Sequence, residues 1–445
     1  MKENTYYLVS LGCAKNTVDS ESMAALLEQK GYQGVGKPSQ AKIMIVNTCG
    51  FIAPARQESI EILQDLAHKK KSGQYLIAAG CLTERSRQLM LERIEGVDGF
   101  IGTRRWMDII ELIEKLDQRG NNIAQYEIPE DTTIGKDEKG VTRSALQGAS
   151  AYLKIADGCR RPCAFCSIPL IKGTTVSRSP ELIIKDAESL QSEGVQELIL
   201  IAQDTTDYGF DLGMKDGLTS LLKDLLPRIP EIPWVRMLYA YPGYVTDSLI
   251  EFMAATPQML HYLDIPLQHA SPDLLKSMKR PSDMDWVHRT IEKMRRAMPD
   301  LALRTTFIVG YPGETEEQFK MLLDFIEEIK FDHLGAFTFS FEPGTASEPL
   351  GDTIPEEVKL ERMDRLMKLQ EKISLNRNQA FIGRSLNVLI EGAGDGLSVG
   401  RSYRDAPEID GLVLIEDEVE AGQIVPVKIT GAMTHDLSGY LDTKK

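Results

Sequence analysis

Short apolar segments alternate with helical patterns along residues 1–115, and this alternation limits the possible folds more than any other feature of the chain. The apolar segments read TYYLVSLGC, KIMIVNTC and YLIAAGC, and helical patterns at about 19–30 and 56–71 separate them. Strands that alternate with helices predict a parallel α/β sheet. We therefore expect residues 1–118 to form an N-terminal α/β domain.

A cysteine ends each of these three apolar segments: Cys13, Cys49 and Cys81. Parallel strands end at the same edge of a sheet, so three thiols that are distant in sequence are expected to share one crevice there. A single buried cysteine is usually a small hydrophobic side chain. Because these are the only cysteines of the predicted domain and all occupy the same strand-end position, we favour ligation of a metal group.

The rest of the chain predicts a linker and two further domains. Polar residues predict a linker at 119–145. Residues 146–376 contain six strand candidates, which alternate with helical patterns and predict an incomplete (β/α) barrel: AYLKIA, VQELILIA, WVRMLYA, HYLDIPL, LALRTTFIV and HLGAFTFSF. Such barrels place their chemistry at the carboxyl ends of the strands.

A long charged amphipathic pattern at 355–380 predicts a helix, which either connects domains or forms a dimer seam. Five short strand patterns follow in residues 377–445: SLNVLIE, LSVGRSY, GLVLIE, IVPVKITG and SGYLD. They predict a small all-β barrel of the OB type as a third domain.

Charge and hydropathy exclude several classes of function. The 445 residues include 51 Lys and Arg against 66 Asp and Glu, a net charge of −15, and residues 377–445 carry seven basic against eleven acidic side chains. An acidic surface repels phosphate backbones, so we expect a basic protein partner and no dominant binding of nucleic acid. No apolar run reaches the ~20 residues of a membrane helix, and the N-terminus lacks the features of a signal peptide, so we expect no membrane association and a cytoplasmic location.

A second group of cysteines lies within one short segment after the strand candidate AYLKIA: Cys159, Cys163 and Cys166. Thiolates select zinc or iron–sulfur clusters. A structural zinc ion usually needs four ligands, and the nearest histidines in the sequence, His68 and His261, are distant. Three cysteines on a four-iron cluster leave one iron without a protein ligand, where a substrate or cofactor can bind.

The spacing C-x3-C-x-aromatic-C, with Phe165 before the last cysteine, resembles the signature of radical S-adenosylmethionine (SAM) enzymes. Together with the upstream cysteines and a final barrel that resembles a TRAM domain, the whole chain resembles the methylthiotransferase branch of that superfamily. The resemblance implies two [4Fe-4S] clusters, a radical SAM cluster and an auxiliary one. Their ligands would be Cys159, Cys163 and Cys166 for the former, and Cys13, Cys49 and Cys81 for the latter.

The resemblance also implies how these groups act. The open iron of the radical SAM cluster would bind SAM and pass on one electron from a low-potential donor, which releases a 5′-deoxyadenosyl radical that takes hydrogen from an unactivated carbon. The auxiliary cluster would present the methylated sulfur, and a second SAM would supply the methyl group. No side chain is required as an acid or base, because the cofactors carry the chemistry.

Three further residues follow strand candidates and could line a pocket for SAM or substrate. Ile308 lies in the segment FIVGYPGE, which resembles a strand end that packs near adenine in radical SAM enzymes. A turn and a capping box at Thr315 and Gln318 would explain part of this segment by structure alone. Gln203 and Gln268 could bind a ligand or belong to loops that cap the next helix.

Local sequences narrow the substrate within the resemblance. Gln-Asp-Thr at 203–205, Leu-Gln-His-Ala-Ser at 267–271 and the segment at 401–410 resemble the branch that acts on the small-subunit ribosomal protein S-twelve. The transfer-RNA branch typically has Gln-Asn-Val and Val-Gln-Ser-Gly. We expect methylthiolation at the β-carbon of an aspartate in S-twelve, free or within the small ribosomal subunit. The alternatives are a transfer-RNA methylthiotransferase that acts on isopentenyladenosine, and a non-catalytic iron–sulfur or zinc scaffold in ribosome assembly.

Overall fold

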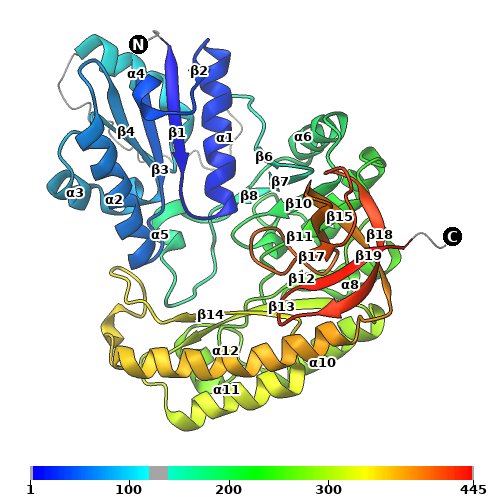
Figure 1. Cartoon of the computed structure of the whole chain (residues 1–445). Helices are drawn as coiled ribbons and strands as arrows, with labels where there is room; N and C mark the ends of the chain where they lie inside the picture. Colours follow the sequence, from blue (N-terminus) through cyan, green and yellow to red (C-terminus); the bar gives the residue numbers. More distant parts are fainter. Residues whose placement is uncertain (1–3, 120–138, 443–445) are drawn as a thin grey trace.

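The computed structural model describes residues 4–119 and 139–442 and contains an N-terminal α/β unit, an open barrel and a small closed barrel (Figure 1). The first unit is a five-stranded sheet of order β2-β1-β3-β4-β5, in which every pair is parallel. Its strands are β1 (Thr5–Ser10), β2 (Gln33–Gly34), β3 (Ile43–Thr48), β4 (Tyr75–Gly80) and β5 (Gly99–Gly102). The parallel sheet predicted from the alternating pattern is confirmed.

Helices cover both faces of this sheet, and an apolar cluster lies on each side of it. They are α1 (Ala14–Gln29), α2 (Ala53–Lys69), α3 (Cys81–Arg93) and α4 (Ile109–Arg119). Helix α1 begins five residues before the predicted start at about residue 19. Its first turn is polar, and most of that turn packs against the second unit instead of the sheet, so the apolar periodicity of a sheet-covering helix appears only later.

The six predicted barrel strands are present in the predicted order, as two parallel sheets that together form an open arc. One sheet contains β7 (Ser150–Lys154), β10 (Glu197–Ile201) and β11 (Trp234–Met237), and the other contains β12 (Tyr262–Asp264), β13 (Ala302–Val309) and β14 (His333–Thr338). A parallel bridge from Val235 to Met259 connects the two sheets. The incomplete barrel is therefore confirmed.

Helices pack on the outside of the arc, around the largest apolar cluster of the described residues. They are α6 (Pro180–Ser192), α7 (Gly217–Leu225), α8 (Asp247–Ala255), α10 (Met284–Ala297) and α11 (Glu316–Ile329), and two short helices, α5 (Ile168–Lys172) and α9 (Pro272–Ser277), lie in connecting segments. Strand β6 (Ser144–Gln147), which the sequence did not predict, pairs antiparallel with β7. Residues 120–138 of the predicted linker lie outside the described residues.

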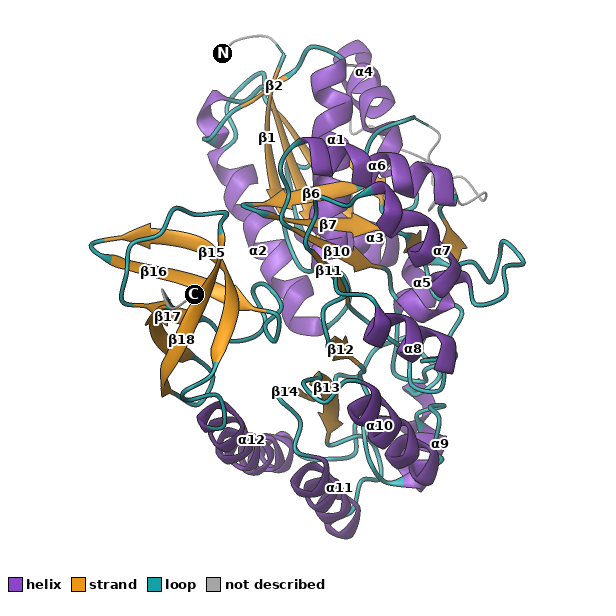
Figure 2. Ribbon diagram, turned by 90° about the vertical axis from the view of Figure 1, so that its right-hand side faces the viewer, coloured by secondary structure: helices purple, strands orange, loops and turns teal. Residues whose placement is uncertain are grey.

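Helix α12 (Glu356–Gln379) runs along the barrel beside β14 and α11 and leads into the last unit. Its Leu366 and Ile373 belong to the barrel core, so the helix connects the units and its apolar side is covered within the chain. Figure 2 shows the final strands curled beside α12. They close in the order β15-β16-β17-β19-β18, which confirms the predicted small barrel.

The strands of this closed barrel are β15 (Ser385–Gly394), β16 (Leu397–Ser402), β17 (Val413–Ile415), β18 (Ile424–Ala432) and β19 (Leu437–Leu441). Alternate side chains point inward and form their own apolar cluster, which includes Val388, Val413 and Val427. Within residues 4–119 and 139–442, no helix is both long enough and apolar enough to cross a membrane.

Candidate iron–sulfur site

Three adjacent strands bring the first group of cysteines together at one edge of the N-terminal sheet, as the sequence predicts. Strands β1, β3 and β4 are neighbours, and their carboxyl ends lead to Cys13, Cys49 and Cys81, called the first triad below. Cys13 is the N-cap of α1, Cys49 follows β3 directly, and Cys81 is the first residue of α3. The three thiols therefore come from three strand ends that are far apart in sequence.

Close backbone approach packs the loops of the first triad tightly. Gly12 and Gly80 both have positive φ values, of 91° and 94°. A Cβ atom on Gly12 would lie 2.9 Å from Cβ of Cys49, and one on Gly80 would lie 2.2 Å from Oδ1 of Asn47. Only glycine satisfies both the backbone conformation and the available space at these positions.

A buried asparagine ties the three loops to one another. The Asn16 side-chain amide donates to the carbonyl oxygens of Leu11 at 2.7 Å and Thr48 at 3.1 Å. Its Oδ1 atom lies 3.8 Å from the sulfur of Cys81. One side chain of α1 therefore contacts the segments that carry all three thiols.

The thiols of the first triad have different electrostatic surroundings. Burial raises the pKa of Cys81 to about 12 and also raises the pKa of Cys49. Desolvation opposes ionisation of Cys13 as well, but the ammonium of Lys15 and the N–H of Asn16 outweigh it and lower the pKa of this thiol. Cys13 is exposed, and it is the thiol of this triad that is most easily ionised.

The second triad comprises the cysteines of the loop between β8 (Ala156–Asp157) and α5: Cys159, Cys163 and Cys166. Backbone amides point at two of the sulfurs. The N–H of Arg161 donates to the Cys159 sulfur and that of Ile168 to the Cys166 sulfur, both at 3.5 Å. Burial raises the pKa of Cys159 to about 11 and of Cys166 to about 12, so a bound metal group is needed to hold them as thiolates at neutral pH.

The remaining sulfur of the second triad contacts two side chains of the barrel. Nη1 of Arg280 donates to the Cys163 sulfur at 3.5 Å, and the Tyr241 hydroxyl lies 3.8 Å from the same sulfur. The guanidinium group of Arg280 also stacks 4.2 Å from the centre of the Tyr241 ring. Donors of this kind stabilise sulfur that carries negative charge.

The loops that carry the two triads meet at the junction of the first unit with the barrel. The hydroxyl of Ser167, next to the second triad, donates to the carbonyl of Phe51 beside the first triad at 3.3 Å. Lys172, at the end of α5, forms an ion pair with Asp19 of α1 at 3.1 Å, and its charge also acts on Cys81. The loops of the two triads are therefore held against each other.

The donor set of each triad fits a [4Fe-4S] cluster better than a single ion. In the described part of the chain, no three His, Cys, Asp or Glu side chains converge closely enough to hold one metal ion, and this includes both triads. A cubane cluster spaces its cysteine sulfurs more widely than one ion does, and the thiols of each triad still lie within each other's electrostatic field. Three thiolates without a fourth ligand leave one iron open.

Three family models match consecutive parts of the chain. Residues 5–102 match the uncharacterized protein family UPF0004, residues 153–326 match the radical SAM superfamily, and residues 382–441 match the TRAM domain. The first and third ranges correspond to the N-terminal sheet and the closed barrel, and the second covers the open barrel from β7 into α11. The second range also contains the second triad.

Curated relatives match the chain over nearly its whole length. Two carry the name ribosomal protein uS12 methylthiotransferase RimO. The one from Roseiflexus sp. is 44% identical and covers 98% of this chain and 97% of its own, and the one from Chloroflexus aurantiacus is 46% identical over 98% and 99%. This chain belongs to the RimO family.

Solved structures with low sequence identity share the fold of this RimO-family chain. The radical SAM methyltransferase TsrM from Kitasatospora setae, with cobalamin and a [4Fe-4S] cluster bound, is 14% identical with a TM-score of 0.56 and covers 89% of this chain and 77% of its own. The cobalamin-dependent radical SAM enzyme OxsB is also 14% identical, with a TM-score of 0.52, and covers 83% and 56%. At this identity the similarity concerns the fold alone.

The structure brings together three of the four pocket residues predicted from the sequence. Phe165, in the loop of the second triad, packs against an apolar cluster that includes Ile308 and Tyr311. The N–H of Ile308 donates to the carbonyl of Gln268 at 2.8 Å, and Gln268 has a positive φ of 76°. Gln203 follows β10 and is half-buried, and no contact with the other three is seen among the described residues.

The alternative, structural explanations of these segments are partly correct. Thr315 and Gln318 form the predicted capping box at the start of α11. After β10, the side chain of Asp204 accepts from the N–H of Thr206, so Asp204 caps the short helix that follows. It also accepts from Nε of Arg161 at 2.6 Å. Asp204 of this RimO-family chain therefore both caps a helix and holds the loop of the second triad through Arg161.

Sequence reasoning missed the charged and aromatic residues around the triads: Lys15, Lys172, Tyr239, Tyr241 and Arg280. Burial lowers the pKa of Lys15 to about 8, and its Nζ atom lies 2.9 Å from the centre of the Tyr239 ring. The available signal was the position of Lys15 two residues after Cys13. For the others, only the fold reveals the proximity.

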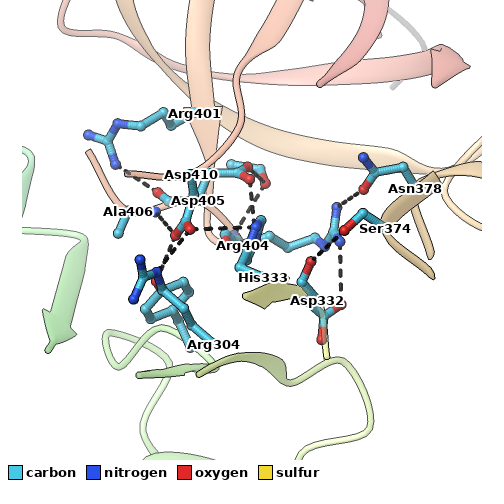
Figure 3. Close-up of polar contacts among 12 residues, drawn as sticks. Arg304, Asp332, His333, Ser374, Asn378, Arg401, Arg404, Asp405, Ala406 and Asp410 are labelled. Atoms are coloured by element: carbon cyan, nitrogen blue, oxygen red, sulfur yellow. Dashed lines mark hydrogen bonds and ion pairs between the residues drawn. The ribbon is translucent and has the colours of Figure 1, made fainter. Parts of the chain in front are cut away.

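The segment at 401–410, which resembles the branch that acts on S-twelve, attaches the third unit to the barrel (Figure 3). Arg404 pairs with Asp332, which follows α11, at 3.3 Å, and Arg304 of β13 pairs with Asp410 at 3.2 Å. Arg304 is 15% exposed, and the other three side chains are at most 2% exposed. This segment therefore fixes the position of the TRAM barrel, and its side chains Arg401, Arg404, Asp405 and Asp410 have partners within the chain.

Proposed function

We propose that this protein is a radical SAM methylthiotransferase that replaces a hydrogen on the β-carbon of an aspartate of ribosomal protein uS12 by a methylthio group. The observation that carries the proposal is the pair of thiol triads whose loops meet at one junction, in a chain that matches RimO relatives over nearly its whole length. Insertion of sulfur at an unactivated carbon needs one-electron chemistry close to a sulfur donor. Two metal-binding triads at one junction could supply both.

The proposal assigns one [4Fe-4S] cluster to each triad and places SAM at the second. When bound, these cofactors supply the removal of hydrogen, the sulfur and the methyl group. The chain itself holds the clusters through six thiolates, and it packs Phe165 and Ile308 beside the second triad, where an adenine ring would be shielded from water. Gln268 and Gln203 remain proposed contacts of SAM or substrate.

Several finer points belong to the same proposal. We divide the chain into residues 1–118, a linker 119–145, the barrel 146–376 and the TRAM domain 377–445. We expect a low-potential electron donor, a cytoplasmic location, and uS12 as partner, free or in the small subunit. The acidic TRAM domain, with seven basic against eleven acidic residues, favours a basic protein over RNA.

The test compares cells with and without the gene, by peptide mass spectrometry of uS12 and nucleoside analysis of transfer RNA. We expect the methylthio mass to disappear from one aspartate-containing peptide of uS12, while the modified adenosines stay unchanged. Loss from adenosine alone would retain the chemistry and overturn the substrate. A loaded, reduced enzyme that fails to cleave SAM would instead favour a non-catalytic scaffold.

A further inference from the structure

Among the residues that the structure describes, buried lysines are paired with carboxylates, with one exception. The described residues include four of them: Lys15, Lys154, Lys172 and Lys359. Lys154 and Lys172 each lie 3.2 Å from Asp157 and also contact Asp19. Lys359 lies 2.7 Å from Asp352. The first of the four has no such partner.

The Lys15 side chain is buried and its ammonium group lacks a carboxylate partner, although its charge acts on the thiol of Cys13. The residue is only 6% exposed, and among the described residues neither a hydrogen bond nor an ion pair reaches its Nζ atom. Its one close contact is the Tyr239 ring, 2.9 Å away at the ring centre. The nearby Asp264 is already paired with Arg304 at 3.2 Å. Buried charges are normally paired, and within the described residues the chain supplies this one with no carboxylate of its own.

The position of Lys15 places that missing carboxylate between the first triad and the barrel. Helix α1 begins directly after Cys13, which is exposed, and Lys15 is the second residue of the helix. One turn later, Val18 packs into an apolar cluster with Tyr152 of β7 and other barrel side chains. Tyr239 follows β11, at the carboxyl end of a barrel strand. The ammonium therefore lies where the two units meet, next to a thiol.

We propose that Lys15 binds the side-chain carboxylate of the aspartate that the enzyme modifies. The inference rests on the proposed function, since it takes aspartate as the substrate side chain. The carboxyl carbon is bonded to the β-carbon, so an ammonium group that fixes the carboxylate also fixes the reacting carbon beside Cys13. Lys15 is thus a specificity-determining residue, and the Tyr239 ring holds its charge in place through a cation–π contact.

Tyr239 supports this role by its backbone. It has a positive φ of 66°, which is unfavourable for an aromatic residue. Such conformations persist where the surrounding structure enforces them, and they gather at binding sites. Here the unusual backbone presents the face of the ring to Lys15.

SAM also carries a carboxylate and is the other possible source of this group. Lys15 lies beside Cys13 of the first triad, whereas SAM cleavage is proposed at the second triad, so we assign the contact to the substrate; a methyl-donating SAM at the first triad would instead appear as lost SAM affinity in the variant. The two sources make different predictions, because loss of Lys15 would weaken either uS12 binding or SAM binding.

The first test leaves the enzyme unchanged. Cluster-loaded protein without reductant is titrated into fluorescently labelled uS12, and into uS12 with the modified aspartate replaced by asparagine, and binding is followed by anisotropy. One charge-assisted hydrogen bond between protein groups corresponds to about a tenfold to hundredfold change in Kd. We expect the aspartate form to bind more tightly by that factor. Equal affinity for the two forms would overturn the inference.

The second test uses Lys15→Met, Lys15→Arg and, as a control for loss of one positive charge, Lys69→Met on the exposed end of α2. We expect Lys15→Met to bind both uS12 forms with the weaker affinity, and Lys15→Arg and Lys69→Met to keep the preference for aspartate. SAM affinity, iron content and melting temperature should match the wild type. Methionine has a similar length and leaves no charge to bury, so the fold should tolerate it.

The outcomes separate this inference from the proposed function. A wild type that modifies uS12, together with a Lys15→Met variant that still prefers aspartate, would overturn the inference alone. A variant that loses SAM affinity or shifts the potential of the auxiliary cluster, with unchanged discrimination, would overturn it in favour of a cofactor contact. A wild type that modifies transfer RNA and ignores uS12 would overturn both.

Discussion

The two cysteine triads of this chain are built in opposite ways. The second triad lies in one short loop between β8 and α5, and amides of the same loop point at two of its sulfurs. The first triad is assembled from the ends of β1, β3 and β4, and a buried asparagine of α1 holds the three loops together. One site is thus a local property of sequence, and the other depends on the whole sheet.

The side chains around the two triads also differ in whether they come from one unit or from two. The side chains on the second triad, Arg280 and Tyr241, belong to the barrel itself. The first triad has Lys15 from its own unit and Lys172 from the barrel. Its electrostatics therefore depend on the docking of the two units. Sulfur transfer is expected to depend on this junction, and SAM cleavage is not.

The strongest test of this comparison removes one thiol from each triad. We expect Cys159→Ala to lose half the iron and to reduce SAM cleavage to background, because the open iron is lost. Cys49→Ala should also lose half the iron, yet keep SAM cleavage and lose methylthio transfer. Iron analysis, 5′-deoxyadenosine release and mass spectrometry of uS12 measure these outcomes. Loss of SAM cleavage in a correctly folded Cys49→Ala would show that the triads are not separable.

The sequence predicted the second triad from spacing alone, and the first only through the fold. Cys13, Cys49 and Cys81 were expected together because parallel strands end at one edge, and β1, β3 and β4 are indeed neighbours. Apolar patterns likewise located the six barrel strands and the closed barrel, because each pattern reflects burial along one strand or helix.

What the sequence did not reveal are contacts between units. Nothing in the local pattern indicates that the charge of Lys172 acts on Cys81, or that Arg404 pairs with Asp332. The segment at 401–410 resembles a substrate-related branch, yet its side chains serve the junction with the barrel. Long polar side chains take their partners from whichever surface lies opposite, and a single sequence carries no information about that surface.

The next test weakens the junction itself. Asp19 of α1 is buried among Arg143, Lys154 and Lys172, with Arg143 at 2.8 Å. Removing its charge leaves buried cations short of a carboxylate, so Asp19→Asn should destabilise the protein by about 3–5 kcal/mol. Urea unfolding measures this, and Asp65→Asn, which breaks an exposed pair with Lys69, should cost less than about 1 kcal/mol. Equal losses would contradict the role of this junction.

Acid should weaken the same junction through the same carboxylate. Although burial opposes ionisation of Asp19, the charges of Lys154 and Lys172 outweigh it and lower its pKa below the value of about 3.9 in the unfolded chain. Its stabilising contribution is therefore complete above about pH 5 and is lost as the pH falls below about 4.

The measurement compares wild type with Asp19→Asn between about pH 5 and pH 3. Uptake of one proton on unfolding changes the unfolding free energy by up to about 1.4 kcal/mol per pH unit. As the pH falls, the unfolding free energy of the wild type should therefore decrease more than that of Asp19→Asn, by up to about this amount per pH unit. If the unfolding free energies of the two proteins fell equally with pH, the pKa of Asp19 would be the same in the folded and the unfolded chain. The charge of Asp19 would then not stabilise the junction.

The smallest expected effect concerns the barrel side of the comparison. The Tyr241 hydroxyl lies 3.8 Å from the Cys163 sulfur and becomes the donor once that sulfur is a thiolate. Groups that donate hydrogen bonds to the sulfurs of a cluster change its reactivity, so Tyr241→Phe should slow SAM cleavage. We expect a decrease of about threefold, which is smaller than usual for residues around a metal site because the contact is long.

Tyr244→Phe is the matched control, since its ring packs against Tyr241 and no hydrogen bond to a thiol is lost. In both variants each SAM cleaved should yield as much methylthiolated uS12 as in the wild type, because the first triad is untouched. A Tyr241→Phe variant with normal cleavage and impaired transfer would place this hydroxyl in the sulfur-transfer step and break the separation between the triads.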